Sequence, residues 1–260
     1  MKKRLIFVAI LVNLIFGVQG FSEVTSKNSD KVIEKVIEEY DKGNKQKAMS
    51  MLKENILKNP SNLELKVFLG MMYEDMGKKK EAEKELNEAV ALQKKYPFIG
   101  DDGKKYDIRL IIGNIYASGK EYEKALKWYK EIDDKYMKDV IGLKEYMIGV
   151  SNYALRNPEE AKKYFLKSYI SDKEGDSEDF LGQIYYEEGN HKEALKWYLK
   201  SVEKGNTDTY PNLGIFYINL NDNAKALQWF RKALEDAKKS KDAEKIKDIQ
   251  ETIKYIESGN

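Results

Sequence analysis

The sequence contains no cysteine, only four prolines and a single histidine, His191, among its 260 residues. The absence of cysteine excludes disulfides, thiol catalysis, cysteine-ligated metals and a lipid-modified N-terminal cysteine. Because proline interrupts helices, its scarcity favours long uninterrupted helical segments. His191 lies in the stretch EGNHKE without a second histidine to share a metal, so we expect it to be a solvated turn residue.

Recognisable catalytic motifs are also missing from the sequence. It has no glycine-rich phosphate-binding loop, and its serines and carboxylates fall in no known catalytic pattern. Adjacent acids such as Glu187 and Glu188 are typical of a wet helix face. We therefore expect no enzymatic activity, no cofactor and no bound metal.

The charges are abundant but balanced. Lysine and arginine number 46 and the acids 44, and together they form 35% of the chain. Lys2, Lys3 and Arg4 precede the first acid, Glu23, so removal of residues 1–20 leaves 43 basic and 44 acidic residues, a net charge of −1. No basic run lacks interleaved acids, and we therefore expect no nucleic-acid partner.

The first twenty residues, MKKRLIFVAILVNLIFGVQG, are typical of a secretory signal peptide. Three cations precede a short apolar run and small residues at a cleavage site. The apolar run is shorter than the roughly 20 residues that cross a membrane, which disfavours the alternative of an uncleaved anchor. We expect cleavage after Gly20, or alternatively after Ser22, export to the periplasm or medium, and a polar leader over residues 21–28.

The clearest pattern is an internal repeat. The phrase EYEKALKWYKEI at 121–132 returns as NHKEALKWYLKS at 190–201. Alanines with these surroundings are Ala48, Ala82, Ala125, Ala161, Ala194 and Ala226. A glycine stands twelve residues before each of the last five: Gly70, Gly113, Gly149, Gly182 and Gly214. A large apolar residue follows each alanine by four: Leu52, Leu86, Tyr129, Phe165, Tyr198 and Phe230.

This spacing predicts helix, tight turn, helix in every repeat. Apolar residues three and four apart share one face of a helix, and stretches such as EGNH and LNDN between glycine and alanine are turn signals. The small glycine and alanine allow two helices to approach closely, while the aromatic residues fill the remaining gaps. Trp128, Trp197 and Trp229 recur in one slot of the second helix, where core packing is favoured over a ligand-anchoring role.

These residues resemble the tetratricopeptide repeat, a 34-residue unit with Leu-Gly-x-x-Tyr in its first helix and Ala-x-x-x-Phe in its second. The resemblance covers residues 29–240 in six repeats, and the KWY and QWF endings are also similar to Sel-like repeats. The fourth repeat departs from the pattern, with Asn152 in place of the tyrosine, and the first keeps only Ala48, Leu52 and Pro60. The resemblance implies an all-α, right-handed α-solenoid that acts as a scaffold for protein–protein interaction.

Two segments fall outside the repeats. Residues 93–105 form an insertion in which Asp101, Asp102 and Gly103 lack the ligand spacing of a calcium loop, so a turn is expected there. Residues 241–260 place isoleucines on one face and charges elsewhere, which predicts the capping helix that a solenoid end requires.

In the tetratricopeptide-repeat family the first helix of each repeat lines a concave groove. Carried onto this sequence, the candidate partner-binding residues are Asp107, Asn114, Tyr146, Tyr153, Asp179, Gln183 and Tyr186. A lining of acids, tyrosines and aliphatic residues favours a basic and apolar protein or peptide segment. Two alternatives remain: a groove that binds nothing, and a structural role through self-association into a homo-oligomer.

Overall fold

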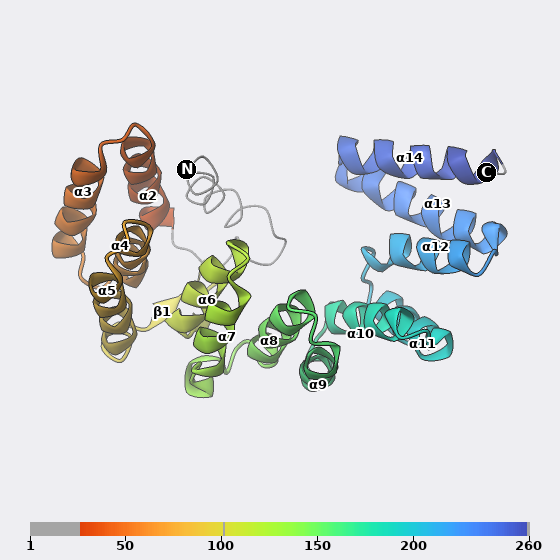
Figure 1. The fold of residues 1–260 in the computed structure, drawn as a ribbon, viewed down its shortest axis with the longest axis horizontal. Coiled ribbons are helices and arrows are strands. Elements are labelled where there is room, and N and C mark those ends of the chain that lie inside the picture. The colour runs from red at the N-terminus through yellow and green to blue at the C-terminus, as the bar shows by residue number, and fades with distance from the viewer. Residues whose placement is uncertain (1–26, 101, 259–260) are drawn as a thin grey trace. The chain divides into compact units, whose positions relative to one another are not determined.

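The computed structural model describes residues 27–100 and 102–258, and the signal peptide expected over 1–20 lies outside them. The described residues form thirteen α-helices, one short 3-10 helix and two very short strands (Figure 1). They divide into two compact units, unit 1 (Met1–Leu155) and unit 2 (Arg156–Asn260), which are treated separately below.

Unit 1 contains α2 (Lys27–Asp41), α3 (Lys45–Lys58), α4 (Leu63–Asp75), α5 (Lys79–Leu92), β1 (Phe98–Ile99), β2 (Lys105–Tyr106), α6 (Ile108–Ser118), α7 (Tyr122–Lys130), the 3-10 helix η1 (Asp134–Tyr136) and α8 (Leu143–Ala154). Unit 2 contains α9 (Pro158–Ser168), α10 (Asp176–Glu187), α11 (His191–Glu203), α12 (Thr209–Asn219), α13 (Asn223–Ser240) and α14 (Ala243–Glu257). Within the described residues, every helix is too short or too polar to span a lipid bilayer.

Consecutive helices pair as the repeat predicts. The packed pairs are α2–α3, α4–α5, α6–α7, α10–α11 and α12–α13 (Figure 1). The predicted all-α class of stacked helix-turn-helix repeats is thereby confirmed. α2 begins at Lys27, within the stretch expected to be a polar leader.

Close packing at the glycines explains the twelve-residue spacing. A Cβ added at Gly182 in α10 would lie 2.5 Å from the Tyr198 ring of α11, and one at Gly214 in α12 would lie 2.6 Å from the Phe230 ring of α13. Ala194 on the facing helix is fully buried. The ring of the second helix therefore rests directly on the glycine of the first, where no larger residue fits.

The tryptophan slot is a packing position, as predicted. Trp197 is only 6% exposed, and Trp128 and Trp229 are half-buried. The Tyr169 ring meets Trp197 edge-on at 5.5 Å between centroids, and the Lys200 ammonium lies 4.2 Å from the Trp197 ring. These aromatic and cation–π contacts keep the indole within the protein.

The insertion forms a small antiparallel hairpin, in which Phe98 of β1 pairs with Tyr106 of β2. The Asp102 carboxylate closes its turn, because it accepts hydrogen bonds from the Lys104 amide at 3.0 Å and the Tyr106 hydroxyl at 2.8 Å. Asp101 lies outside the described residues. In the described ranges no three acids or histidines come together as metal ligands.

The last helix, α14, packs along α13. It buries Ile249 and Ile256 in a cluster with Phe230 and Ala237, while Asp242 caps its N-terminus by accepting from the Lys245 amide at 2.9 Å. The arrangement matches that expected of a cap, because the opposite face of α14 carries mainly charged, exposed side chains.

Candidate interaction surface

In unit 2, a stripe of polar residues runs along α10. Asp176, Asp179, Gln183 and Tyr186 follow at spacings of three, four and three residues, which places them on one face of the helix. The last three are sequence-predicted site residues, and the fold brings them together. Asp176 is exposed, Gln183 and Tyr186 are half-buried and Asp179 is 9% exposed.

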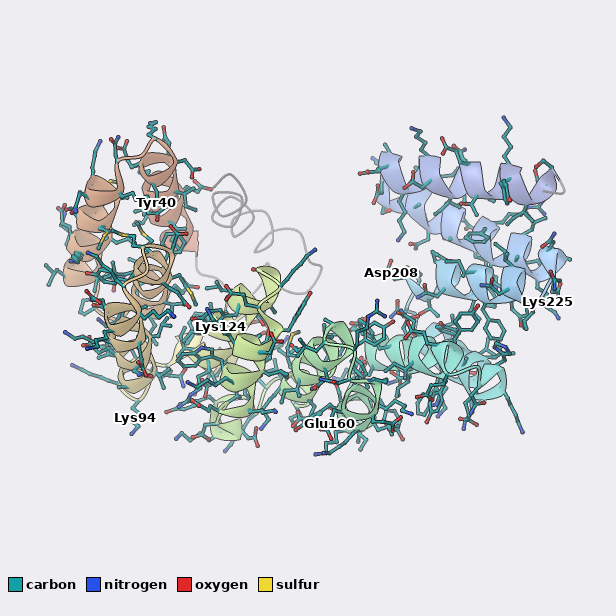
Figure 2. All side chains as sticks on the ribbon, in the orientation of Figure 1. Tyr40, Lys94, Lys124, Glu160, Asp208 and Lys225 are labelled. Atoms are coloured by element: carbon teal, nitrogen blue, oxygen red, sulfur yellow. The ribbon has the colours of Figure 1, made fainter. Side chains whose placement is uncertain are left out.

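A matching stripe runs along α12, the first helix of the next repeat. Asp208 immediately precedes this helix, and Asn212, Ile215 and Asn219 follow at spacings of four, three and four residues. Asp208 and Asn219 are exposed, and Ile215 keeps 48% of its surface in solvent. Figure 2 labels Asp208 at the start of this stripe.

A hydrogen bond from Asn212 to Asp179 joins the two stripes. The Asn212 carboxamide donates to both oxygens of the Asp179 carboxylate at 3.0 and 2.9 Å, and Gln183 donates to it at 2.7 Å. Burial raises the pKa of Asp179 although these hydrogen bonds act to lower it. Asp179 therefore fixes the spacing of α10 and α12 rather than presenting a free charge.

The N-terminal end of this surface is acidic. Partial removal of Asp176 from water, followed by the charge of Asp172, raises the pKa of the Asp176 carboxyl to about 6, and Asn206 opposes this rise with a hydrogen bond of 2.9 Å. Asp208 accepts an ion pair from Lys245 of α14 at 2.8 Å. Sequence reasoning missed Asn206, Asn212 and Lys245, because each acts through a contact with another helix or loop.

The opposite end of the surface is aromatic. The Tyr186 ring lies 5.8 Å from the Phe216 ring, and the His191 imidazole lies 5.7 Å from Tyr186 and 6.0 Å from Phe216. His191 is exposed, as expected, but it is the first residue of α11 rather than a turn residue, and it packs against an aromatic cluster that its sequence context did not reveal. Along the helices, the surface thus carries carboxylates at its N-terminal end, amides and Ile215 in the middle, and aromatic rings at its C-terminal end. From here on it is called the α10/α12 face.

The other four predicted site residues belong to unit 1. Asn114 accepts a hydrogen bond from the Tyr129 hydroxyl at 2.8 Å, and Tyr146 and Tyr153 are half-buried on α8. Asp107 is fully buried, so we correct the expectation that it lines an accessible groove.

Asp107 has a structural role at the start of α6. Its carboxylate accepts the Arg109 amide at 2.9 Å, the Arg109 guanidinium at 2.7 Å and the Asp133 amide at 3.0 Å. These bonds cap the helix and fasten the segment that follows α7. Because Asp107 is buried and its carboxylate already accepts these three hydrogen bonds, it is not available to a ligand.

The paired helices and their polar stripes define a helical-repeat scaffold for protein–protein interaction. Family profiles described as tetratricopeptide repeat match residues 63–96, 146–209 and 207–240. The chain belongs to the tetratricopeptide-repeat family. A search of curated proteins finds no significant match.

Solved structures with a similar fold include PilW, described as a widely conserved type IV pilus biogenesis factor. It is 11% identical, with 87% of this chain and 100% of that chain covered and a TM-score of 0.50. PilF of Pseudomonas aeruginosa is 17% identical, with 86% and 96% covered and a TM-score of 0.48. A tetratricopeptide repeat protein of Parabacteroides merdae is 20% identical, with 89% and 99% covered and a TM-score of 0.47. At these identities the likeness concerns the fold alone.

Proposed function

We propose that this scaffold is exported to the bacterial envelope and binds a basic and apolar protein segment on its α10/α12 face. The observation that carries the proposal is the pairing of the two stripes by the Asn212–Asp179 hydrogen bonds, which places exposed carboxylates and Ile215 on one continuous surface. Such a surface offers attraction for a cation and contact for an apolar side chain.

The charges of the face favour a cationic partner. Asp176 and Asp208 are both exposed at its acidic end, and Lys245 is the one cation that pairs with either of them among the described residues. Exposed charges mainly speed the approach of an oppositely charged partner and orient it on the surface. Binding should therefore weaken as salt rises, because the Debye length shortens from about 10 Å at 0.1 M to about 3 Å at 1 M.

The apolar part of the face supplies the other component of binding. Ile215 is 48% exposed in the middle of the α12 stripe, and Tyr186 of the α10 stripe is half-buried against Phe216, the residue that follows Ile215. Burial of apolar surface contributes about 25 cal/mol per Å², so one aliphatic partner residue at this position stabilises the complex measurably. The half-buried Asn212 and Gln183 are already engaged with Asp179 and help to shape the site.

The test compares a double variant of the α10/α12 face with a double variant on the neighbouring helix α11. The probes are labelled, terminally blocked peptides in which lysine or glutamate alternates with leucine. The lysine peptide should bind and the glutamate peptide should not. Ile215→Ser combined with Asp208→Asn removes an apolar contact and a carboxylate together, and it should weaken binding of the lysine peptide about tenfold or more, which corresponds to about 1.4 kcal/mol.

Leu199→Ser combined with Glu203→Gln is the matched control, because Leu199 is also partly exposed, at 38%, and Glu203 is exposed, but both lie on the second helix α11. It should leave peptide affinity unchanged. Equal losses in both variants, or equal binding of the two peptides, would refute the α10/α12 face as the binding surface. Asp179 is unsuitable for this test because its substitution would also break the hydrogen bonds from Asn212 that join α10 and α12.

Export is tested on the native protein. Mass spectrometry of the envelope fraction should find a chain that begins at Phe21, or at Glu23 if cleavage follows Ser22. An intact N-terminus in the cytosol would contradict export. Sizing of the mature chain over a range of concentrations distinguishes a peptide-binding monomer from a self-associating structural component.

A further inference from the structure

Unit 1 contains a pocket that the sequence did not predict. It lies between the C-terminal end of α4 and the adjoining parts of α6 and α7, with a volume of about 290 Å³. Its lining consists of Met71, Glu74, Asp75, Gly77, Lys79, Tyr116, Glu121 and Lys124. Ligand pockets usually measure about 300–1,000 Å³, so this one suits a single side chain rather than a larger molecule.

The chain's own Lys124 shows which group the pocket accepts. Its ammonium lies 2.5 Å from the Glu74 carboxylate, 2.7 Å from Glu121 and 5.0 Å from the centre of the Tyr116 ring. Burial acts to lower the pKa of Lys124, but the hydrogen bonds that its ammonium donates to Glu121 and Glu74 outweigh burial and raise the pKa. The ammonium of Lys124 is thus held in its charged form by two carboxylates and an aromatic ring.

The arrangement is built into the fold. Tyr116 is only 5% exposed, and its hydroxyl donates to Glu74, which fixes both the ring and the carboxylate. Burial, and then this hydrogen bond, raise the pKa of Tyr116, so it remains a neutral donor at physiological pH. Met71, at 8% exposure, adds an apolar wall for the stem of a long side chain.

A second carboxylate of the pocket binds an ammonium in the same way. Asp75 accepts the Tyr40 hydroxyl and pairs with Lys45 at 3.7 Å, and Lys45 lies 4.8 Å from the centre of the Tyr40 ring. Glu74 and Asp75 are the last residues of α4, where the negative end of the helix dipole also favours a cation.

The present occupant is held weakly. Lys124 is 48% exposed and Glu121 is 42% exposed, and ion pairs of this kind contribute about 0–1 kcal/mol. When the Lys124 side chain turns out into solvent, the pocket lining keeps the carboxylates of Glu74, Asp75 and Glu121, against the ammonium of Lys79 in the lining and that of Lys45 beside Asp75. An ammonium supplied by another molecule would find the same acceptors.

We propose that this pocket is a subsite for a lysine or arginine side chain of a partner protein, which enters by displacing Lys124. Lys124 then competes with the partner side chain for the same carboxylates and so lowers the partner's affinity. The pocket belongs to unit 1 and the α10/α12 face to unit 2, so the variants that test one leave the residues of the other untouched.

The experiment uses the full mature chain and small probes. Nα-acetyl-lysine methylamide is titrated while the methyl signal of Met71 is followed by NMR, and Nα-acetyl-norleucine methylamide serves as the uncharged counterpart. Lys124→Ala should bind the lysine probe about tenfold more tightly than the parent does. Adding Glu121→Gln to Lys124→Ala should reverse most of this gain.

Lys127→Ala is the matched control, because Lys127 is an exposed lysine of the same helix that does not line the pocket. It should bind the probe as the parent does. The proposal is overturned if Lys124→Ala gains no affinity, or if it gains equally for the norleucine probe. Failure of the peptide test on the α10/α12 face would leave this result unaffected, and so the two proposals fail separately.

Discussion

At the residue scale, the position five residues before each repeat alanine has one backbone conformation but several residue types. Glycine occupies it in three repeats, whereas lysine, arginine and asparagine occupy it in the others. All six have positive φ, and they are Gly43, Gly77, Lys120, Arg156, Gly189 and Asn221. The turn thus requires the left-handed conformation in every repeat, and the non-glycine residues adopt it against a steric cost of about 1–2 kcal/mol.

Lys120→Gly should therefore stabilise the protein. Lys120 has φ of 61°, and removal of its Cβ relieves strain that exceeds the extra freedom glycine gains on unfolding. We expect a gain of about 0.5–1 kcal/mol by chemical denaturation. The converse change, Gly189→Ala, should cost about 1 kcal/mol by conformation alone, because φ is 75° and no atom lies within 4 Å of the new Cβ. Equal stability of all three proteins would contradict the argument.

Asp176 gives a second prediction at this scale, on pH. Its pKa rises from 3.8 to about 6 in the folded protein, so the folded state holds the proton more tightly than the unfolded chain does. The stability that Asp176 contributes is complete below pH 4 and is lost as the pH rises through 6. Asp176→Asn stays neutral and should therefore be more stable than the parent at pH 7 and similar to it at pH 4.

Thermal melting of both proteins at several pH values between 4 and 7 measures this difference. The two chains differ only at this position, so the comparison isolates the Asp176 carboxyl together with its charge interactions with Asp172 and Asp208. A difference in stability that stays constant across the range would show that Asp176 has an ordinary pKa.

At the scale of elements, the repeat spacing predicted the helices and the contacts between the two helices of a repeat. The contact between Gly182 and Tyr198 follows from a fixed offset that recurs along the chain, since helix pairs built alike must touch at the same positions. The role of Asp107 was predicted wrongly, because an acid before a helix can either face a groove or cap the helix. Its cap bond to Arg109 has a sequence signal, an aspartate directly before an apolar run, which the groove assignment overlooked.

The burial of Asp179 was not predicted for a different reason. Its register on α10 is as predicted, but Asn212 of the next repeat closes on it and takes it out of solvent. Gln93 is a similar case, because this residue at the C-terminal end of α5 is 1% exposed and accepts a hydrogen bond from the Ile108 amide at the start of α6. Contacts of this kind join residues distant in sequence and have no periodic signal in a single chain.

The capping helix provides a prediction for an element. Ile249 is 6% exposed and packs within the α13–α14 cluster, so Ile249→Ala should cost about 2–4 kcal/mol. Tyr255→Ala on the same helix should change stability by no more than about 0.5 kcal/mol, because Tyr255 is 61% exposed. Deletion of residues 241–260 should expose Phe230 and Ala237 and cause aggregation, which light scattering detects. A truncated chain as soluble as the parent would show that α14 is not a cap.

At the scale of the whole molecule, the chain forms two compact units although the same helix-turn-helix repeat recurs along its sequence. Each repeat packs chiefly on its neighbours in sequence, since the main helix contacts join consecutive elements. In such arrays stability is approximately a sum of local terms and nearest-neighbour terms. A local defect should consequently destabilise its own unit more than the other.

Two tryptophans allow this to be measured, because Trp128 lies in unit 1 and Trp197 in unit 2. In proteins that keep only one of them, Gly182→Ala drives a Cβ against Tyr198 and should cost about 1–3 kcal/mol in unit 2. With a urea slope of about 1–3 kcal/mol per M, the midpoint reported by Trp197 should fall by about 1 M while that of Trp128 stays in place. Gly113→Ala, which meets the Tyr129 ring in unit 1, should produce the reverse pattern. If either substitution moves both midpoints equally, the two units unfold as one cooperative body and the nearest-neighbour description does not hold.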